Sequence, residues 1–258
     1  MTTMTAKVTK VSQNSSVLVL ISTVVFLALW EIVGRSGVVF AITPGSEVIP
    51  VMLKELFTGG LGTAILGTLG TAGLGLLIAL ALGIPLGLAT GASKRVAWVV
   101  DPVLNAGFAM PSAILLPVVG LYLGLGLAAK LFMVVVFCIF VIAINTATGV
   151  KTVPESTKEM ARAYGFSNSQ IAVKVVLRSA MPAILTGARI GVSRAVQGAV
   201  LAELLLQASN IGLYLIHAGS TFDVTKLLGG IVAITLVASL LMSAAGAAER
   251  RLMRWKTG

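Results

Sequence analysis

Charged side chains are scarce in this chain. Only 11% of its 258 residues are charged, whereas soluble domains carry about a quarter. Hydrophobic residues make up 57% of the sequence, and the mean hydropathy is +1.02. A globule this small cannot bury so much apolar surface, but lipid can cover it. The composition excludes an ordinary soluble domain and predicts an all-α membrane protein in contact with membrane lipid.

Groups that usually carry chemistry are also nearly missing. The only cysteine, Cys138, lies within an apolar run, and the only histidine, His217, follows another. One thiol forms no disulfide framework and no cysteine-based metal cluster within a chain. We interpret both residues as packing or surface groups and expect neither a metal site nor a cofactor in this chain. The phosphate-binding pattern Gly-x-x-x-x-Gly-Lys-Ser/Thr is missing, and no Gly-Lys dipeptide occurs. Energy for any active process must therefore come from a partner or an ion gradient.

Six apolar runs are long enough to cross a bilayer, which takes about 20 residues. They lie at residues 17–34, 62–91, 98–124, 131–150, 184–206 and 227–248. The first run exceeds a signal-peptide core and is interpreted as a retained span. The second exceeds one span, so it either tilts or begins along the membrane surface. Its glycines Gly83, Gly87 and Gly91 recur every four residues, which favours close helix packing.

The net charge of +10 follows the topology rather than a nucleic-acid surface. With both termini cytoplasmic, the cytoplasmic segments hold most of the basic residues. These are Lys7, Lys10, Lys94, Arg95, Lys151, Lys158, Arg162, Lys174, Arg178, Arg250, Arg251, Arg254 and Lys256. The outer segments hold Arg35, Lys54, Lys130 and Lys226. We therefore expect a cytoplasmic tail at 1–16, one transmembrane domain at 17–248, a second cytoplasmic tail at 249–258, and no nucleic-acid partner.

The polar segment at residues 151–182 lies between the fourth and fifth runs and predicts a helix–turn–helix. Pro154 and Glu155 suit a first helical turn, and Gly165 suits the left-handed position that ends a helix. Ser167 with Gln170 predicts a capping box for a second helix. Pro182 is expected to interrupt that helix before the fifth span. The segment is longer than a simple connection needs, although a surface hairpin that only links two spans is the alternative.

This loop resembles the Glu-Ala-Ala…Gly…Ile…Leu-Pro loop of binding-protein-dependent ABC importer permeases. The matching positions are Glu159, Ala161, Gly165, Ile171 and Pro182. Other pieces are similar to the nitrate/sulfonate/taurine subgroup, namely Asn145-Thr146 with Gly149, Val153-Pro154-Glu155, Thr186-Gly187, Arg189-Ile190, Ala202-Glu203-Leu204, Asn210-Ile211-Gly212-Leu213 with Ile216 and Ala218, and the tail from Glu249 to Trp255. The resemblance covers roughly residues 60–255. Met160 and Met181 depart from it, since they replace an alanine and a leucine of the motif.

The resemblance implies a type I importer permease with six transmembrane helices and a cytoplasmic coupling loop. Glu159, Ala161, Gly165 and Ser167 would form the elbow that docks a cytoplasmic ATPase, with Ala161 facing that partner. ATP and Mg would be bound by the ATPase rather than by this chain, so the chain itself would be no enzyme. A solute-binding protein outside the cytoplasm and a second permease copy would complete the importer in the bacterial inner membrane.

Four polar side chains lie within apolar runs: Asn145, Arg194, Gln197 and Glu203. Such groups at membrane depth usually face a partner or a cavity. The functional interpretation places them on a translocation path, with Arg194 contacting an anion and Glu203 acting as a gate. The structural alternative is packing between helices or snorkelling toward the interface. Arg194 and Glu203 are nine residues apart on one helix, which is too far for direct pairing.

Two other functions are open to a polytopic membrane protein. An ion-coupled secondary transporter could use Glu203 as its coupling acid, but no convincing inverted repeat is present, and the cytoplasmic elbow would have no role. A membrane enzyme needs a catalytic constellation that one histidine, one cysteine and no acidic pair in a span do not supply. The resemblance suggests a small, often anionic solute such as a sulfonate or nitrate, although permeases of this subgroup also carry heterocycles.

Overall fold

A computed structural model describes residues 15–37, 42–206 and 209–253, and the regular elements in these ranges are helical. They are α1 (Ser15–Ser36), α2 (Gly45–Phe57), α3 (Leu61–Ala92), α4 (Lys94–Ala109), η2 (Ser112–Leu115), α5 (Leu116–Leu123), α6 (Leu127–Lys151), α7 (Glu155–Ala163), α8 (Asn168–Gln170), η3 (Ile171–Leu177), α9 (Arg178–Leu205), α10 (Asn210–Ser220) and α11 (Val224–Leu252). The tail residues Lys7, Lys10, Arg254, Trp255 and Lys256 lie outside the described ranges.

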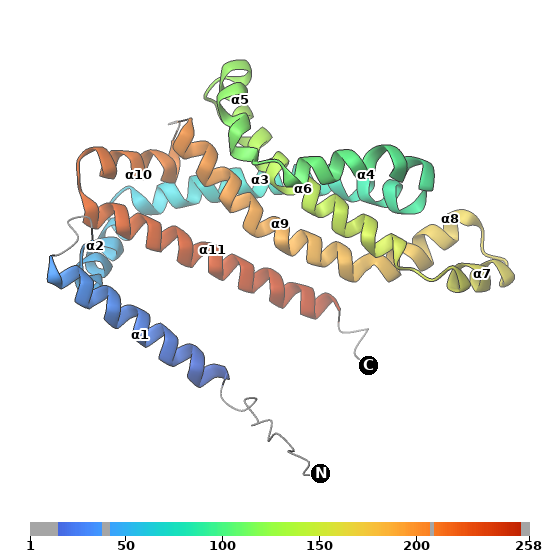
Figure 1. Cartoon of the computed structure of the whole chain (residues 1–258), viewed down its shortest axis with the longest axis horizontal. Coiled ribbons are helices and arrows are strands. Elements are labelled where there is room, and N and C mark those ends of the chain that lie inside the picture. The colour runs from blue at the N-terminus through green and yellow to red at the C-terminus, as the bar shows by residue number, and fades with distance from the viewer. Residues whose placement is uncertain (1–14, 38–41, 207–208, 254–258) are drawn as a thin grey trace, which may run out of the picture.

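Five stretches of helix are long and apolar enough to cross a membrane, and a bent helix pair brings the number to six if it counts as one span. The five are Leu18–Ser36, Leu61–Ala92, Leu127–Lys151, Asn168–Leu205 and Val224–Leu252. Most of these helices run side by side along the long axis of the molecule (Figure 1). The predicted all-α membrane fold is confirmed.

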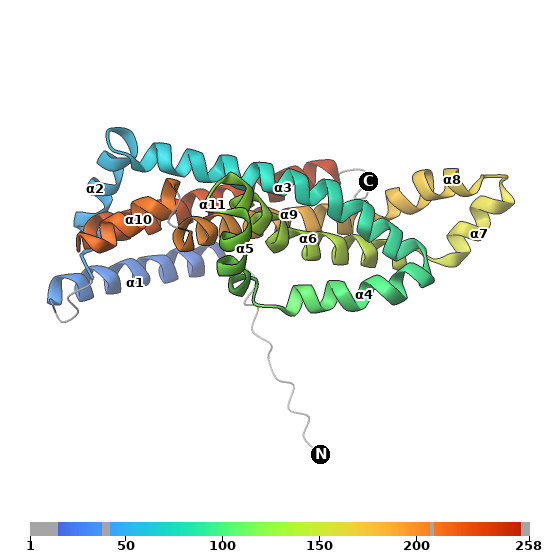
Figure 2. The ribbon, with the colours of Figure 1, turned by 90° about the horizontal axis from the view of Figure 1, so that it is seen from above.

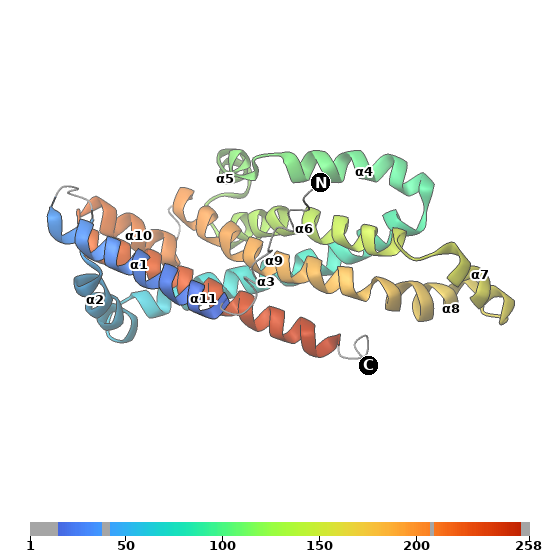
Figure 3. The same ribbon diagram turned by 60° about the horizontal axis from the view of Figure 1, so that its bottom comes forward.

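The third predicted span is not one straight helix. α4 and the segment Ser112–Leu123 are bent by 89° relative to each other. Met110 and Pro111 at the break have extended backbone angles, with ψ of 133° and 90°. Proline lacks the N–H that continues a helix, and it disfavours helical angles at the residue before it. Figure 3 shows the two arms to one side of the other long helices, and Figure 2 shows α4 along one edge of the bundle.

Helices α3, α6 and α9 form the packed centre of the bundle, and glycines on α3 allow the close approach. A Cβ on Gly87 would lie 2.5 Å from the Ala143 carbonyl oxygen and 2.6 Å from the Thr146 Cβ. Gly83 and Gly91 meet α6 in the same way. The strip of glycines predicted from the four-residue spacing is therefore the α3–α6 contact.

The second run is one continuous helix, α3, which passes through Pro85. Helix α2 is a separate element that ends before this run begins, and α3 has no break that would set off a surface segment at its start. The prediction that Pro182 interrupts the chain before the fifth span is wrong, because helix is continuous over Asn168–Leu205. A π-helical stretch, η3, ends shortly before Pro182. Local π adjustments let membrane helices accommodate a proline by satisfying the backbone groups that it frees.

Candidate functional site

The elbow between α6 and α9 is built from local signals. α7 begins after Pro154 and ends at Tyr164, and Gly165 follows with a φ of +78°. The N–H of Gly165 donates to the Arg162 carbonyl at 2.9 Å, and that of Phe166 donates to the Ala161 carbonyl at 3.1 Å. Such bonds close a helix around a left-handed residue. The predicted conformation of Gly165 is confirmed.

The predicted capping box is also present. The Ser167 hydroxyl accepts from the Gln170 N–H at 3.4 Å, and the Gln170 side-chain oxygen accepts from the Ser167 N–H at 2.9 Å. The second half of the elbow is no isolated short helix, because α8 continues through η3 into α9. The elbow is therefore joined without a break to a membrane-spanning helix (Figure 1).

Ala161 differs from its expected orientation. Its side chain was expected to face a partner, but only 8% of the residue is exposed and it lies within the elbow. A small side chain is needed here because α7 folds back onto η3. Ala161 shapes the elbow, while Glu159 is exposed on its surface.

Three large side chains are exposed on α7 and the turn that follows it, although this part of the elbow is otherwise mostly polar. Met160 is 60% exposed, Tyr164 78% and Phe166 38%. Lys174 lies 5.6 Å from the centre of the Phe166 ring. Sequence reasoning treated Met160 as a mere departure and passed over both aromatic residues. Their occurrence in a charged, short-helix segment outside the apolar runs was the available signal. We call Met160, Tyr164 and Phe166 the elbow patch.

Glu155 organises the start of α7 by accepting from two cations. Its carboxylate lies 2.9 Å from the Lys158 amine and 3.3 Å from the Arg162 guanidinium. Hydrogen bonding to Lys158, followed by that to Arg162, lowers the pKa of Glu155 below its ordinary value. All three groups are solvent-accessible, so salt screens these pairs and their net contribution is small.

Glu203 lies at the opposite end of the bundle and is fully buried. One carboxylate oxygen accepts from the Thr68 hydroxyl at 2.7 Å, and the other accepts from the Asn210 amide at 2.7 Å. The Thr68 oxygen in turn accepts from the Ile211 N–H at 3.2 Å. Gly212 packs directly on the Glu203 backbone. Glu203 therefore joins α3, α9 and α10 as a structural pin.

Lys130 reinforces this end of the bundle. It was placed among the outer loop cations, yet the residue is only 7% exposed and its amine donates to the Ser209 hydroxyl at 2.7 Å. Ser209 follows α9, so the bond ties the start of α6 to the α9–α10 connection. This burial escaped the sequence because Lys130 and Ser209 are 79 positions apart.

Arg194 sits in the middle of α9 and borders a cavity of about 180 Å³. The bend residues Met110 and Pro111 form one side of that cavity, and the rings of Phe137 and Phe140 form another. Arg194 is exposed, and among residues 15–37, 42–206 and 209–253 it has no hydrogen-bonding or ion-pair partner. A permanent cation thus stands at membrane depth beside a broken helix.

The other predicted path residues point elsewhere. Gln197 borders a separate groove of about 440 Å³ between α9 and α11, together with Thr235 and Ser239. The Asn145 amide donates to the Val141 carbonyl at 2.8 Å, and its Cβ faces Gly187 on α9. The structure does not bring Asn145 to Arg194 or Glu203. Gln197 follows Arg194 by three residues on α9 but borders a different pocket. Of the four predicted path residues, Arg194 and Gln197 are the two with exposed polar side chains that border a pocket.

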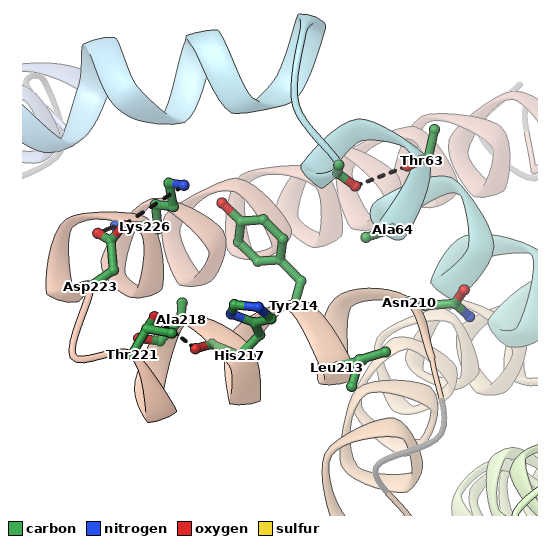
Figure 4. A pocket seen from close by; sticks show the side chains of 11 residues that line it. Thr63, Ala64, Asn210, Leu213, Tyr214, His217, Ala218, Thr221, Asp223 and Lys226 are labelled. Atoms are coloured by element: carbon green, nitrogen blue, oxygen red, sulfur yellow. Dashed lines mark hydrogen bonds and ion pairs between the residues drawn. The ribbon is translucent and has the colours of Figure 1, made fainter.

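A larger pocket of about 540 Å³ opens at the α10 end of the bundle. Tyr214 and His217 project into it from α10, with Asp223 and Lys226 beyond them (Figure 4). Lys226 pairs with Glu55 at 3.3 Å and with Asp223 at 3.8 Å. Burial, then the neighbouring Glu55 and Asp223 carboxylates, raise the pKa of Tyr214 to about 12. The charges of this pocket are largely balanced. The sequence analysis named some of its lining residues, such as Asn210, His217 and Lys226, but did not predict that they share a pocket.

These features define a polytopic α-helical membrane protein with a polar elbow on one spanning helix. The chain belongs to the family of binding-protein-dependent transport system inner membrane components, whose sequence profile matches residues 83–255. It is therefore an inner-membrane permease subunit of an ABC importer, as the resemblance implied. This assignment disfavours the ion-coupled alternative.

Relatives with named solutes support the subgroup. The chain is 31% identical over 234 residues to the putative aliphatic sulfonates transport permease protein SsuC of Bacillus subtilis (strain 168), covering 90% of this chain and 85% of that protein. It is 30% identical over 165 residues to the taurine transport system permease protein TauC of Escherichia coli (strain K12), covering 64% and 60%. The nitrate import permease protein NrtB of Synechocystis sp. is 26% identical over 225 residues, covering 84% and 82%.

A solved structure supports the fold. A chain of the MetNI methionine ABC transporter in an inward-facing conformation aligns with a TM-score of 0.68 at 21% identity. The alignment covers 78% of this chain and 99% of that one. The type I importer fold predicted for this chain is thereby confirmed.

Proposed function

We propose that two copies of this chain form a path for a small anionic solute across the inner membrane, with both termini in the cytoplasm. An extracytoplasmic binding protein supplies the solute, and a separate cytoplasmic ATPase drives the import by acting on the elbow. The observation that carries this proposal is the unbroken helix Asn168–Leu205, which joins the elbow to Arg194. A displacement of the elbow therefore moves the helix that carries Arg194.

The elbow patch is the proposed ATPase contact. Met160, Tyr164 and Phe166 expose apolar surface in a segment that lies outside the apolar runs. Aromatic and methionine side chains are enriched where proteins dock. Gly165 and Ser167 fix the shape of this surface, and Glu159 adds a charge at its edge.

The proposed solute class follows from the charge on Arg194. This guanidinium faces a cavity and has no anion among the described residues. An unpaired cation at membrane depth needs a counter-charge or water. An anionic solute supplies that charge transiently, and the relatives named for sulfonates, taurine and nitrate transport acidic or zwitterionic compounds.

A second copy of the chain is proposed to cover the polar face of α9. Arg194 and Gln197 are both exposed on this helix within an apolar span. Lipid cannot hydrogen-bond either group, so exposure to the bilayer core would be costly. A homodimer with water and solute between the two copies removes that cost.

The coupling role is tested with two elbow variants. Tyr164→Asp places a charge in the proposed contact, and Gly165→Val forces a β-branched residue toward positive φ, which is strained. Loss of an aromatic anchor from an interface costs about 2 kcal/mol or more, so recovery of the co-expressed ATPase is expected to fall at least about tenfold. Ser156→Asp, exposed on the same helix, is the matched control. Normal recovery and normal uptake in both variants, at normal membrane abundance, would refute the docking role.

The path role is tested at Arg194. Arg194→Gln removes the charge at similar length, whereas Arg194→Lys keeps it. We expect the concentration for half-maximal uptake to rise about tenfold or more in Arg194→Gln, because a charge-assisted hydrogen bond is worth about 1.5–3 kcal/mol. The lysine variant should retain part of the uptake. Unchanged uptake in an assembled Arg194→Gln complex would leave Arg194 as a packing residue.

A further inference from the structure

A cavity between α9 and α11 combines one arginine with apolar side chains. It measures about 420 Å³ and is lined by Arg178, Met181 and Leu185 from α9 and by Leu252 from α11. One wall is cationic and the other three are apolar. It lies where the last turn of α11 reaches the start of α9, at the end of the bundle that carries the elbow (Figure 1).

Positive charge gathers around this cavity without matching acids. Arg178 is exposed and has no hydrogen bond or ion pair with any residue in the described ranges. Arg250 and Arg251 occupy the last turn of α11, are exposed, and likewise lack partners among those residues. The acid beside them, Glu249, is already bound to Thr186 at 2.9 Å and to Arg189 at 3.3 Å. The site is therefore complementary to an anion.

We propose that this cavity binds an anionic phospholipid. The headgroup phosphate pairs with Arg178, and part of an acyl chain fills the space between Met181, Leu185 and Leu252. Basic pockets between the ends of membrane helices have the chemistry that anionic headgroups require. The apolar walls favour a lipid over free phosphate, because inorganic phosphate gains nothing from them. A transported solute is also disfavoured, since the cavity lies beside the ends of two spans rather than beside Arg194.

The charged half of this proposal is tested by lipid binding to the purified chain in detergent. Native mass spectrometry counts bound dioleoyl phosphatidylglycerol, dioleoyl phosphatidylcholine and inorganic phosphate. We expect one tightly held phosphatidylglycerol per chain, preferred about fivefold over phosphatidylcholine, since one interfacial arginine is worth about 1 kcal/mol. Arg178→Gln should abolish the preference. Arg95→Gln is the control, because Arg95 is exposed at the start of α4, outside this cavity.

The apolar half is tested by Leu185→Trp, which fills the cavity and keeps Arg178. This variant should lose the tightly held lipid of either headgroup. A persistent phosphatidylglycerol preference in Arg178→Gln would overturn the proposal. The proposal would also be overturned if millimolar phosphate displaced phosphatidylglycerol equally well from Leu185→Trp and from the unaltered chain. The ligand would then be the free anion. Loss of the lipid when the ATPase binds would instead assign the cavity to a protein interface.

The readout is lipid binding by the permease alone, so its failure leaves the transport proposal intact. Each variant is compared at matched helicity and matched size-exclusion profile. If Arg178→Gln does not fold, the Leu185→Trp variant with both lipids still decides whether the cavity holds an acyl chain.

Discussion

The centre of the bundle and the elbow are held together by opposite means. In the centre, α3 and α6 approach so closely that a Cβ on Gly87 would collide with the Ala143 carbonyl and Thr146. In the elbow, short-range bonds such as the Ser167–Gln170 capping box maintain the shape, and large apolar side chains face outward. Close packing restricts movement between α3 and α6, whereas the elbow has exposed surface to offer a partner. The difference separates the part that resists deformation from the part on which we propose that the ATPase acts.

The largest effect is expected in the centre. Gly87→Val should lower the free energy of unfolding by about 3 kcal/mol or more, because overpacking against backbone cannot be relieved by a side-chain rotation. Gly73→Val on the same helix is the matched control, since a Cβ there meets nothing within 4 Å. Thermal unfolding in detergent and membrane abundance measure the difference. If the two variants had equal melting temperatures, the close contact between α3 and α6 would not be what limits the size of residue 87.

An intermediate effect is expected at the polar pin. Glu203→Ala removes the acceptor of the half-buried Asn210 amide and one of the two acceptors of the buried Thr68 hydroxyl, which keeps the Ala64 carbonyl. The expected loss is about 2 kcal/mol. Glu203→Gln should recover most of it, because an amide keeps one acceptor and gains a donor that the Thr68 oxygen can accept.

The melting temperatures of the two Glu203 variants, compared with exposed Glu159→Ala, measure this effect. If Glu203→Ala melts like the unaltered chain while uptake is lost, Glu203 serves transport directly rather than as a pin.

The smallest effect is expected in the elbow. Lys158 and Arg162 lower the pKa of Glu155, so the carboxylate is charged and paired at neutral pH. Its stabilising contribution is lost as the pH falls below 4.5 through that lowered pKa. Hydrogen-exchange protection of the α7 amides should decline over this range, while protection of α6 does not.

The Glu155→Gln variant is the control for the acid response. Its α7 protection should be slightly lower at neutral pH and should not change further as the pH falls. Added salt should weaken the effect in the unaltered chain, because all three groups are solvent-accessible. An identical acid response in Glu155→Gln would assign it to other groups.

Local signals made the elbow predictable. Pro154, Gly165 and the Ser167–Gln170 pair act within a few residues, so their spacing alone indicated the turn and its cap. The glycine strip on α3 was equally legible, since four-residue spacing defines one helix face. By contrast, the partners of Glu203 include Thr68, which is 135 positions away. No local pattern identifies such a partner.

Whether a proline interrupts its helix was the hardest feature to predict from the sequence. Pro85 and Pro182 lie inside continuous helices, whereas Pro111 stands at a bend of 89°. The missing N–H is common to all three, so the outcome depends on whether the surrounding backbone can take up the freed carbonyl. The π-helical stretch before Pro182 supplies one such adjustment. The orientation of Ala161 was missed for a related reason, because it depends on how α7 folds onto η3.

The unbroken helix from Asn168 to Leu205 has the geometry of a lever that pivots near its middle. Its 38 residues give a rod of about 57 Å. Gly187, which presses against Asn145 of α6, lies almost at its midpoint. If that contact is the fulcrum, the two arms are about 28 Å long, and a rotation of about 10° displaces each end by roughly 5 Å in opposite senses. A shift of that size at the elbow would be returned, undiminished and reversed, at the far end of the lever where Glu203 anchors α10.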